Sequence, residues 1–450
     1  MPLLERKDSV TIARGIISKS KATETEVVID SAIDRFVRYA EHGPTQDADR
    51  GHALVRVRVR NKTPEGYREA TASCGSLEPA AYKAALERAQ ELALVAPPNP
   101  RLAPLGGAVM VPMVLRDRAT IDQTFEAKAR WIKLATEACA KHGLFPAGLA
   151  QTTGISRAIV NSCGREVLSY QTRAAFSLTA TGKNGEGWAE AIARTIGALP
   201  IEATVQRAID KALAAQDPEP IEPGEYTVVL EPAAVASLLL FTGYEGFGAR
   251  EYEEQTSFLC GRLGQQVFPP SVTIHDDYRH PAWASLPFDG EGTARTQVVL
   301  VENGVPKRVV TDRNHAAHSG GESTGHALLQ PSSHGPMPQN LVLLPGKQSR
   351  AELVAGVERG LLVTQLHYVN LMDPRELLLT GITRNGTYRI ENGKLGRAVR
   401  NLRFTDSLVR TLGTLSGISN EQVVCGALFD GECVVPALRL SLRFTSTTEF

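Results

Sequence analysis

The sequence predicts an α+β protein with two domains, and three kinds of pattern carry that prediction. In the first 220 residues, helix-spaced apolar residues mix with alternating, strand-like segments. Beyond them, Asn-Gly pairs separate strand-like runs, and Asn-Gly favours the type I′ turn of a β-hairpin. A proline-rich segment, residues 217–224, separates these two kinds of sequence pattern. We expect an N-terminal mixed α/β domain with an antiparallel sheet over residues 1–220 and a predominantly antiparallel β domain over residues 221–450.

The N-terminal half contains four helix-like patterns, over residues 27–40, 78–95, 120–142 and 202–215. Residues 52–60 alternate strictly, which predicts a strand with Val55, Val57 and Val59 on a buried face. The opposite face carries Arg56, Arg58 and Arg60, and we expect it to be solvated. Short β patterns between residues 157 and 195 predict hairpins that turn at Cys163-Gly164 and Asn184-Gly185.

The C-terminal half begins with a strand pattern over residues 226–230, followed by a helix that starts at Pro232. We expect this helix to end in the glycine-rich residues 243–248. The remaining hairpins are predicted at three Asn-Gly pairs, Asn303-Gly304, Asn385-Gly386 and Asn392-Gly393.

The composition is that of an ordinary globular protein, with 42% apolar and 22% charged residues in 450. Lys+Arg and Asp+Glu both total 49, which argues against nucleic acid or an anionic membrane as partner. The six cysteines are scattered, and the N-terminus places charges where a signal peptide needs an apolar run. The longest nearly apolar run, residues 233–241, is too short to span a bilayer. We therefore expect a cytoplasmic protein with reduced thiols.

A stretch near the middle of the chain carries a specific motif. Residues 257–268 read Ser-Phe-Leu-Cys-Gly-Arg-Leu-Gly-Gln-Gln-Val-Phe. This resembles the TldD/PmbA family of metallopeptidases, also called the modulator of DNA gyrase family, in which a serine-containing apolar turn leads into Gly-Arg-Leu/Ile-Gly-Gln-Gln-Val. Further similar segments follow in family order, at residues 285–292, 301–307, 323–325, 360–381 and 390–401.

The family's catalytic members carry a metal-binding His-Glu-x-x-x-His helix just upstream of this motif. Counting back without a gap, that helix falls on residues 240–245, and Leu240 and Glu245 occupy the histidine positions. A zinc peptidase needs three protein ligands, an open position for water and a carboxylate that moves protons. The resemblance is therefore closest to the PmbA/TldE-like branch that lacks the metal motif, and we expect no catalytic or metal-binding residue in the matched segment.

The resemblance implies a role in a complex. A metal-free chain of this family would pair with a catalytic TldD-like subunit that carries the zinc, close the proteolytic chamber, and bind extended or unfolded peptides. Exposed strand edges could hold such peptides by β-addition. This chain would then be active only with its partner. The peptide, the identity of the partner and any homodimer are left open by the sequence.

Other clusters could supply a relocated metal site in a self-sufficient metallopeptidase. His315, His318 and His326 form the best set, but no suitably placed acid accompanies them, and a solvated helix end beside a glycine-rich loop explains them better. His275, Asp276, Asp277 and His280 are a second set, which a turn at a strand end accounts for. The glycines at 243, 246 and 248 follow a helix, whereas phosphate loops precede one.

Two cysteines lie near the place where the family's catalytic members carry a metal-binding cysteine. Cys425 and Cys433 match that place equally imperfectly, and without partner histidines an inert thiol is the better interpretation. Ser323, Thr324, Gly325 and Cys425 are candidates for a peptide cleft. The sequence contains no G-x-S-x-G elbow of a serine hydrolase. A non-enzymatic binding or regulatory protein, for instance one acting on DNA gyrase, is a further alternative with little support from the neutral charge.

Overall fold

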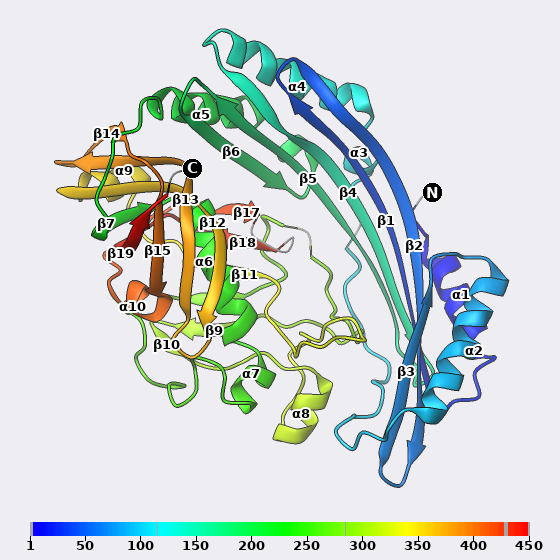
Figure 1. Ribbon diagram of the computed structural model, residues 1–450. Helices are drawn as coiled ribbons and strands as arrows, with labels where there is room; N and C mark the ends of the chain where they lie inside the picture. Colours follow the sequence, from blue (N-terminus) through cyan, green and yellow to red (C-terminus); the bar gives the residue numbers. More distant parts are fainter. Residues whose placement is uncertain (1–2, 115, 284, 427–430, 449–450) are drawn as a thin grey trace.

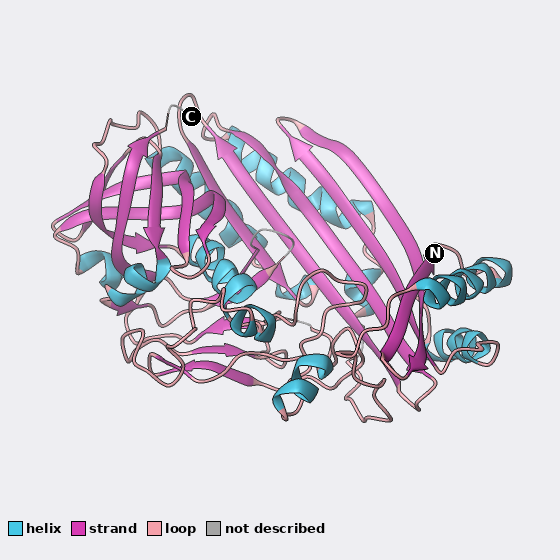
Figure 2. Cartoon of the chain, turned by 60° about the horizontal axis from the view of Figure 1, so that its bottom comes forward, coloured by secondary structure: helices cyan, strands magenta, loops and turns pink. Residues whose placement is uncertain are grey.

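The computed structural model describes residues 3–114, 116–283, 285–426 and 431–448 (Figure 1). Its helices and mainly antiparallel sheets confirm the predicted α+β class. One long curved sheet is built from the strands before residue 194, and two shorter sheets are built from strands after residue 223. Figure 2 shows the long sheet on one side of the molecule and the shorter strands on the other. No helix among the described residues is long and apolar enough to cross a membrane.

The long N-terminal sheet is entirely antiparallel, in the order β3-β2-β1-β4-β5-β6. Its strands are β1 (Glu24–Ala40), β2 (Gly43–Thr63), β3 (Gly66–Cys74), β4 (Phe145–Asn161), β5 (Glu166–Thr181) and β6 (Glu186–Ala193). The predicted turns at Cys163-Gly164 and Asn184-Gly185 lie between β4, β5 and β6. Each strand alternates its side chains between the two faces, so the sheet has an outer and an inner side.

Helices cover the outer side of this sheet (Figure 1). They are α1 (Arg6–Ile17), α2 (Pro79–Val95), α3 (Arg118–Ile121), α4 (Phe125–Ala140) and α5 (Ile201–Ala214), with a 3-10 turn η1 (Ile196–Ala198) before the last. One core joins α1 and α2 to Val27, Ile29 and Val57. A second joins α4 and α5 to Tyr39 and Phe176. The inner side is left for the C-terminal half.

Two helix predictions in this half need correction. Residues 27–40 belong to β1 and not to a helix. The strand is central, and both of its faces are largely buried, so apolar residues occur on both faces and imitate helical spacing. The predicted helix over residues 120–142 is two helices, because α3 ends at Ile121 and α4 begins after Thr124. Helices α2 and α5 lie where they were predicted.

Five strands of the C-terminal half close into a barrel. These are β7 (Gly224–Leu230), β12 (Arg359–Asp373), β13 (Leu378–Glu391), β15 (Leu402–Ser407) and β19 (Leu438–Thr447). The ring closes because β13 pairs with both β15 and β12, while β7 joins β12 to β19. The short strands β14 (Lys394–Ala398) and β16 (Gly417–Ile418) pair with β13 and β19.

The third sheet lies beside the barrel, in the order β10-β9-β8-β11-β18-β17. Its members are β8 (Ile274–Asp276), β9 (Val298–Glu302), β10 (Val305–Pro306), β11 (Leu341–Leu343), β17 (Val423–Gly426) and β18 (Glu432–Val435). The helices of this half are α6 (Pro232–Gly246), α7 (Ala249–Glu253), α8 (Arg313–Ser319), α9 (Arg350–Ala355) and α10 (Leu408–Gly413). Helix α6 packs against strands of both β structures, and their apolar side chains share one core.

The Asn-Gly predictions are right at two of three positions. Asn303-Gly304 joins β9 to β10, and Asn392-Gly393 joins β13 to β14. Asn385-Gly386 lies inside β13, where both residues have positive φ and the register with β12 shifts. The positive φ that the pair allows is thus used for a strand irregularity instead of a hairpin.

Candidate functional site at the end of helix α6

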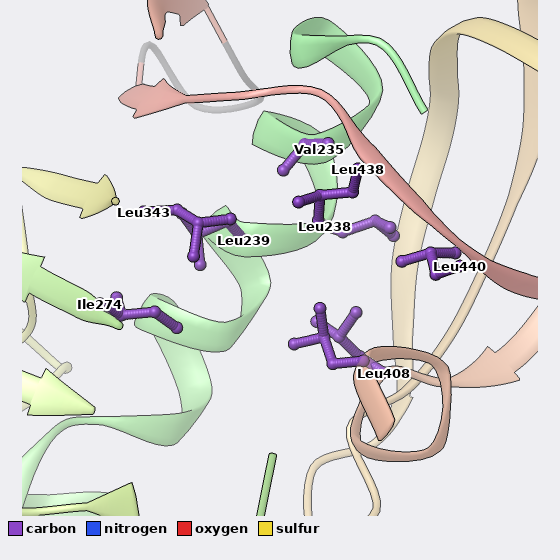
Figure 3. A pocket seen from close by; sticks show the side chains of 9 residues that line it. Val235, Leu238, Leu239, Ile274, Leu343, Leu408, Leu438 and Leu440 are labelled. Carbon is purple, nitrogen blue, oxygen red and sulfur yellow. The ribbon is translucent and has the colours of Figure 1, made fainter. Parts of the chain in front are cut away.

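Helix α6 carries mostly apolar side chains on all of its faces. This pattern fits a helix that β strands surround. Pro232 occupies its first turn, and most of its residues are buried. Val235, Leu238 and Leu239 face Ile274 and Leu343 from the third sheet and Leu438 and Leu440 from β19 (Figure 3). The cavity that these side chains line is wholly apolar and only about 20 Å³ in volume. It is a packing gap and not a ligand pocket.

The two positions where the resemblance would require histidines lie on this helix. Leu240 is half-buried and packs against the apolar core. Glu245 lies one turn further on and is also half-buried. Burial, together with the neighbouring Glu251 carboxylate, raises the pKa of Glu245. The helix therefore offers one carboxylate and no imidazole at these positions.

A small polar cluster surrounds the C-terminal end of α6. The Tyr244 hydroxyl lies 3.2 Å from Nε2 of His334, and the two rings are 5.3 Å apart. Burial raises the pKa of Glu251, which lies on α7. Gly248 caps α7 tightly, since a Cβ atom there would lie 2.0 Å from the Glu251 carboxylate and 2.6 Å from the Pro336 carbonyl. The cluster can bind or release protons and offer hydrogen bonds.

No group of three or more His, Cys, Asp or Glu side chains that could hold a metal ion is formed by the residues that the structure describes. The three histidines singled out in the sequence each have another partner. His315 Nδ1 lies 2.8 Å from the Asp312 carboxylate, and His318 Nδ1 lies 2.7 Å from the Asn314 carbonyl. Burial would lower the pKa of His315, but the bond to Asp312 outweighs it and the pKa is raised. The sequence cluster does not fold into a three-histidine site.

His326 instead belongs to a buried triad-like row. Its Nδ1 lies 2.9 Å from the Thr324 hydroxyl, and its Nε2 lies 2.9 Å from Asp276 on β8. The three side chains are almost completely buried, and the Thr324 hydroxyl donates to the Thr311 carbonyl at 3.0 Å. Burial alone would raise the pKa of Asp276, but His326 outweighs it and keeps the pKa below its usual value. A nucleophile must reach its substrate, whereas these buried side chains connect the loop at Thr324 to Thr311 and to β8.

The other sequence candidates also make structural contacts. Ser323 Oγ donates to the Thr311 carbonyl. Gly325 has a φ of +76°, and a Cβ atom there would lie 2.4 Å from the Ala294 carbonyl oxygen. His275 and Asp276 lie on the short strand β8, and Asp277 and His280 follow it, as the strand-end interpretation predicts.

The two cysteines are paired on adjacent antiparallel strands. Cys425 on β17 is opposite Cys433 on β18, and both are buried. Burial raises the pKa of Cys433 to about 12 and raises the pKa of Cys425. Both thiols therefore stay protonated at neutral pH, which suits an apolar filling role better than metal binding.

Comparison with known proteins identifies the family to which this architecture belongs. The PmbA/TldA metallopeptidase C-terminal domain matches residues 223–446, and the central domain of the same family matches residues 120–216. The chain belongs to the PmbA/TldD metallopeptidase family. In fold it is similar to TldE from Thermococcus kodakarensis, with a TM-score of 0.85 at 22% identity over 97% of this chain and 99% of that one.

Curated relatives of this PmbA/TldD chain match over shorter segments. A zinc metalloprotease TldD homolog of Saccharolobus solfataricus is 29% identical over 44% of each chain. A metalloprotease of Methanothermobacter thermautotrophicus is 25% identical over 59% of this chain and 60% of its own length. An uncharacterized protein of Methanocaldococcus jannaschii is 34% identical over 40% of this chain and 42% of its own length. The chain thus spans about 40 to 60% of these relatives.

A second polar site, which the sequence did not reveal, joins the two halves of this PmbA/TldD chain. The turn over residues 289–292 lies against the inner side of the N-terminal sheet, where Arg58 Nη2 lies 2.5 Å from Glu26 and Nη1 lies 3.6 Å from Glu69. Arg58 and Arg60 are almost completely buried, so their predicted solvated face is wrong. The face is covered by the chain around Ala103, whose carbonyl accepts from Arg60, and by the turn that carries Glu291, and no single strand pattern can indicate either.

Glu291 is a buried carboxyl of this site whose pKa is strongly raised. Burial, with the adjacent Asp289 carboxylate, raises the pKa of Glu291 to about 7, although Arg58 lowers it. Asp289 itself accepts backbone N–H bonds from Glu291, Thr293 and Ala327, all at 2.9 Å. Arg165 then spans the junction, donating from Nε to the Gly107 carbonyl at 2.8 Å and from Nη1 to the Gly292 carbonyl. The Arg165 side chain thereby links the N-terminal half to the turn over residues 289–292 of the C-terminal half.

Proposed function

We propose that this chain is the metal-free subunit of a cytoplasmic PmbA/TldD-type zinc metallopeptidase, which closes the proteolytic chamber and holds extended peptide. The observation that carries the proposal is the apolar, enclosed helix α6. Leu240 and Glu245 stand where the resemblance requires histidines, and Leu240 packs into the core. In this proposal zinc and its proton-transferring glutamate belong to a partner that carries His-Glu-x-x-x-His.

The side chains around α6 fit a supporting role. A polar cluster of Tyr244, Glu245, Glu251 and His334 sits at the helix end without a group that could hold a metal ion among the described residues. Such groups can hydrogen-bond a peptide through their hydroxyl, imidazole and carboxyl atoms. The partner would supply the Lewis acid and the activated water.

The test is to measure metal content and peptidase activity of the full chain, alone and mixed with a His-Glu-x-x-x-His family member from the same host. We expect less than stoichiometric zinc and no cleavage of unfolded casein by the chain alone, and cleavage by the mixture. A partner with its motif glutamate changed to glutamine is the matched control and should leave the mixture inactive.

Two results would overturn the proposal. Stoichiometric zinc that is released by His315→Ala or His318→Ala would establish a self-sufficient metallopeptidase. A chain that never forms a complex with a catalytic family member and never increases its activity would instead be a binding or regulatory protein.

A further inference from the structure

One lysine on the outer side of the N-terminal sheet is as deeply buried as the apolar core. Helix α4 packs on this side (Figure 1), and its buried residues are Lys128, Ile132, Ala135 and Cys139. Their spacing is that of one face of a helix. Lys128 therefore occupies the first position of a stripe that is otherwise apolar, and its side chain is only 1% exposed.

The amino group of Lys128 is buried without a close partner. In the part of the chain that the structure describes, it makes no hydrogen bond and no ion pair with a carboxylate. Lysine is almost never buried in this way unless it is paired, because an unpaired ammonium group loses its hydration and gains no hydrogen bond in return. The position therefore favours a form of this side chain other than the free ammonium.

Four charged side chains of strands β1 and β2 act on Lys128. Arg35 is the cation among them, and the acids are Asp34, Asp47 and Asp49. Burial, with the Arg35 cation, lowers the pKa of Lys128 to about 8, although the three acids oppose this shift. At about pH 8, roughly half of the Lys128 side chains are therefore neutral amines, compared with about 0.4% for an ordinary lysine. A neutral amine is a nucleophile.

The acids of this group are engaged or exposed, whereas Arg35 keeps a free donor. Asp49 accepts from Arg35 Nε at 2.8 Å, and Asp34 accepts from a glutamine side chain of β4 at 2.7 Å. Asp47 is exposed. Arg35 Nη1 donates to the Ile121 carbonyl, and Arg35 Nη2 has no hydrogen-bond partner among the described residues. This guanidinium can therefore still pair with an anion beside it.

We propose that Lys128 is a carbamylation site, at which carbon dioxide adds to the side-chain amine and the Arg35 guanidinium holds the resulting carbamate. The lone pair of Nζ attacks the carbon atom of carbon dioxide, and a C–N bond forms as one C–O π pair moves onto oxygen. One proton then leaves Nζ to water. This site is distinct from helix α6, and the inference does not depend on the proposed function.

Two features of the site favour this electrophile. A side chain that is 1% exposed admits only a small reagent, and carbon dioxide is small and uncharged. The addition also replaces a buried cation beside a second cation by an anion beside a cation. Buried charges are stable when they are paired in this way.

The test uses the full chain with isotope-labelled bicarbonate at about pH 8 and detects the carbamate carbonyl by NMR spectroscopy. Lys128→Met removes the amine and fills its space with an apolar chain. Lys133→Met is the matched control on the same helix, where Lys133 is 75% exposed and lies 3.7 Å from Glu137. We expect a carbamate signal in the wild type and in Lys133→Met that is lost in Lys128→Met.

A second pair of variants tests the role of Arg35 as a positioning residue. Arg35→Gln should reduce the carbamate signal about ten-fold, as loss of one charge-assisted hydrogen bond predicts. Arg38→Gln is the control and should leave the signal unchanged, because Arg38 lies on the opposite face of β1, over the Phe36 ring at 5.8 Å. An unchanged far-ultraviolet spectrum confirms that each variant folds.

The modification should also stabilise the fold, because a ligand that binds only the folded state raises its stability. The midpoint of thermal unfolding should rise with carbon dioxide at constant pH in the wild type and stay constant in Lys128→Met. Absence of a carbamate signal from the wild type, or a signal that Lys128→Met retains in full, would overturn the inference. A signal that Arg35→Gln leaves unchanged would overturn the assignment of Arg35.

Discussion

Two enclosed regions of this chain bury opposite kinds of side chain. Helix α6 is enclosed by β structure and buries hydrocarbon, with Leu238 and Leu239 about 4% exposed. The interdomain site at Arg58, Glu26 and Glu291 is enclosed to a similar degree and buries charge. Enclosed charge is stable only if it is paired and hydrogen-bonded. The difference teaches that buried charge in this molecule is held in pairs on the inner side of the N-terminal sheet, while helix α6 forms ordinary apolar core.

The largest effect should come from removing the buried cation Arg58, which pairs with Glu26 and Glu69 within the N-terminal sheet. Arg58→Leu leaves Glu26 without its buried cation, while Glu69 keeps Arg60, and should lower the free energy of unfolding by about 3–5 kcal/mol. Urea unfolding measures it. Lys83→Ala removes one partner of an exposed pair with Glu87 and should change stability by less than about 0.5 kcal/mol. Equal effects of the two variants would contradict the comparison.

A hydrocarbon deletion in α6 should come next. Leu239→Ala enlarges the existing apolar gap and should cost about 3 kcal/mol in the same unfolding assay. Leu395→Ala, at a side chain that is 53% exposed, serves as the control and should stay within about 0.5 kcal/mol. A negligible effect of Leu239→Ala would mean that the helix is less tightly enclosed than its contacts indicate.

Crowding at the end of α6 should have an intermediate effect. Gly248→Ala places a Cβ atom 2.6 Å from the Pro336 carbonyl, which should cost about 1–3 kcal/mol. Gly413→Ala adds a Cβ atom with no heavy atom within 4 Å and should be nearly neutral. Differential scanning calorimetry of both variants distinguishes a local steric clash from a general cost of replacing glycine by alanine.

Counted per pH unit, the smallest expected effect is the dependence of stability on pH. The pKa of Glu291 is raised from 4.5 to about 7 in the folded chain, so the folded state binds this proton more tightly than the unfolded state. Its contribution to stability is therefore full below pH 4.5 and is lost as the pH rises through 7. Between these values the wild type should lose stability relative to Glu291→Gln by at most about 1.4 kcal/mol per pH unit. Parallel stability curves of the two proteins would refute the assignment.

Much of the architecture could be predicted from local patterns, and two of the misses share one cause. Helices α2, α5 and α6 and the hairpins of β4 to β6 follow from periodicity and turn residues. The strand β1 and the buried Arg58 and Arg60 were missed because their surroundings come from segments far away in the sequence. Asn385-Gly386 was assigned to a hairpin because a positive φ is common to turns and bulges.

Some residues of the candidate site could likewise be located from the sequence, whereas others needed the fold. Leu240 and Glu245 could be located by counting from a motif, whereas the Tyr244–His334 contact joins residues 90 positions apart and needed the fold. His315, His318 and His326 cluster in the sequence, but β8 draws His326 into the core through Asp276.

The closed barrel has a consequence for how this protein is made. Strand β19 lies between β7 and β15, so residues near 224 must wait for residues near 444 before the ring can form. Contacts of such long sequence separation form slowly, and incomplete chains expose open strand edges meanwhile. During synthesis the N-terminal sheet can therefore assemble first, while the barrel strands stay vulnerable to aggregation until the ribosome has delivered β19.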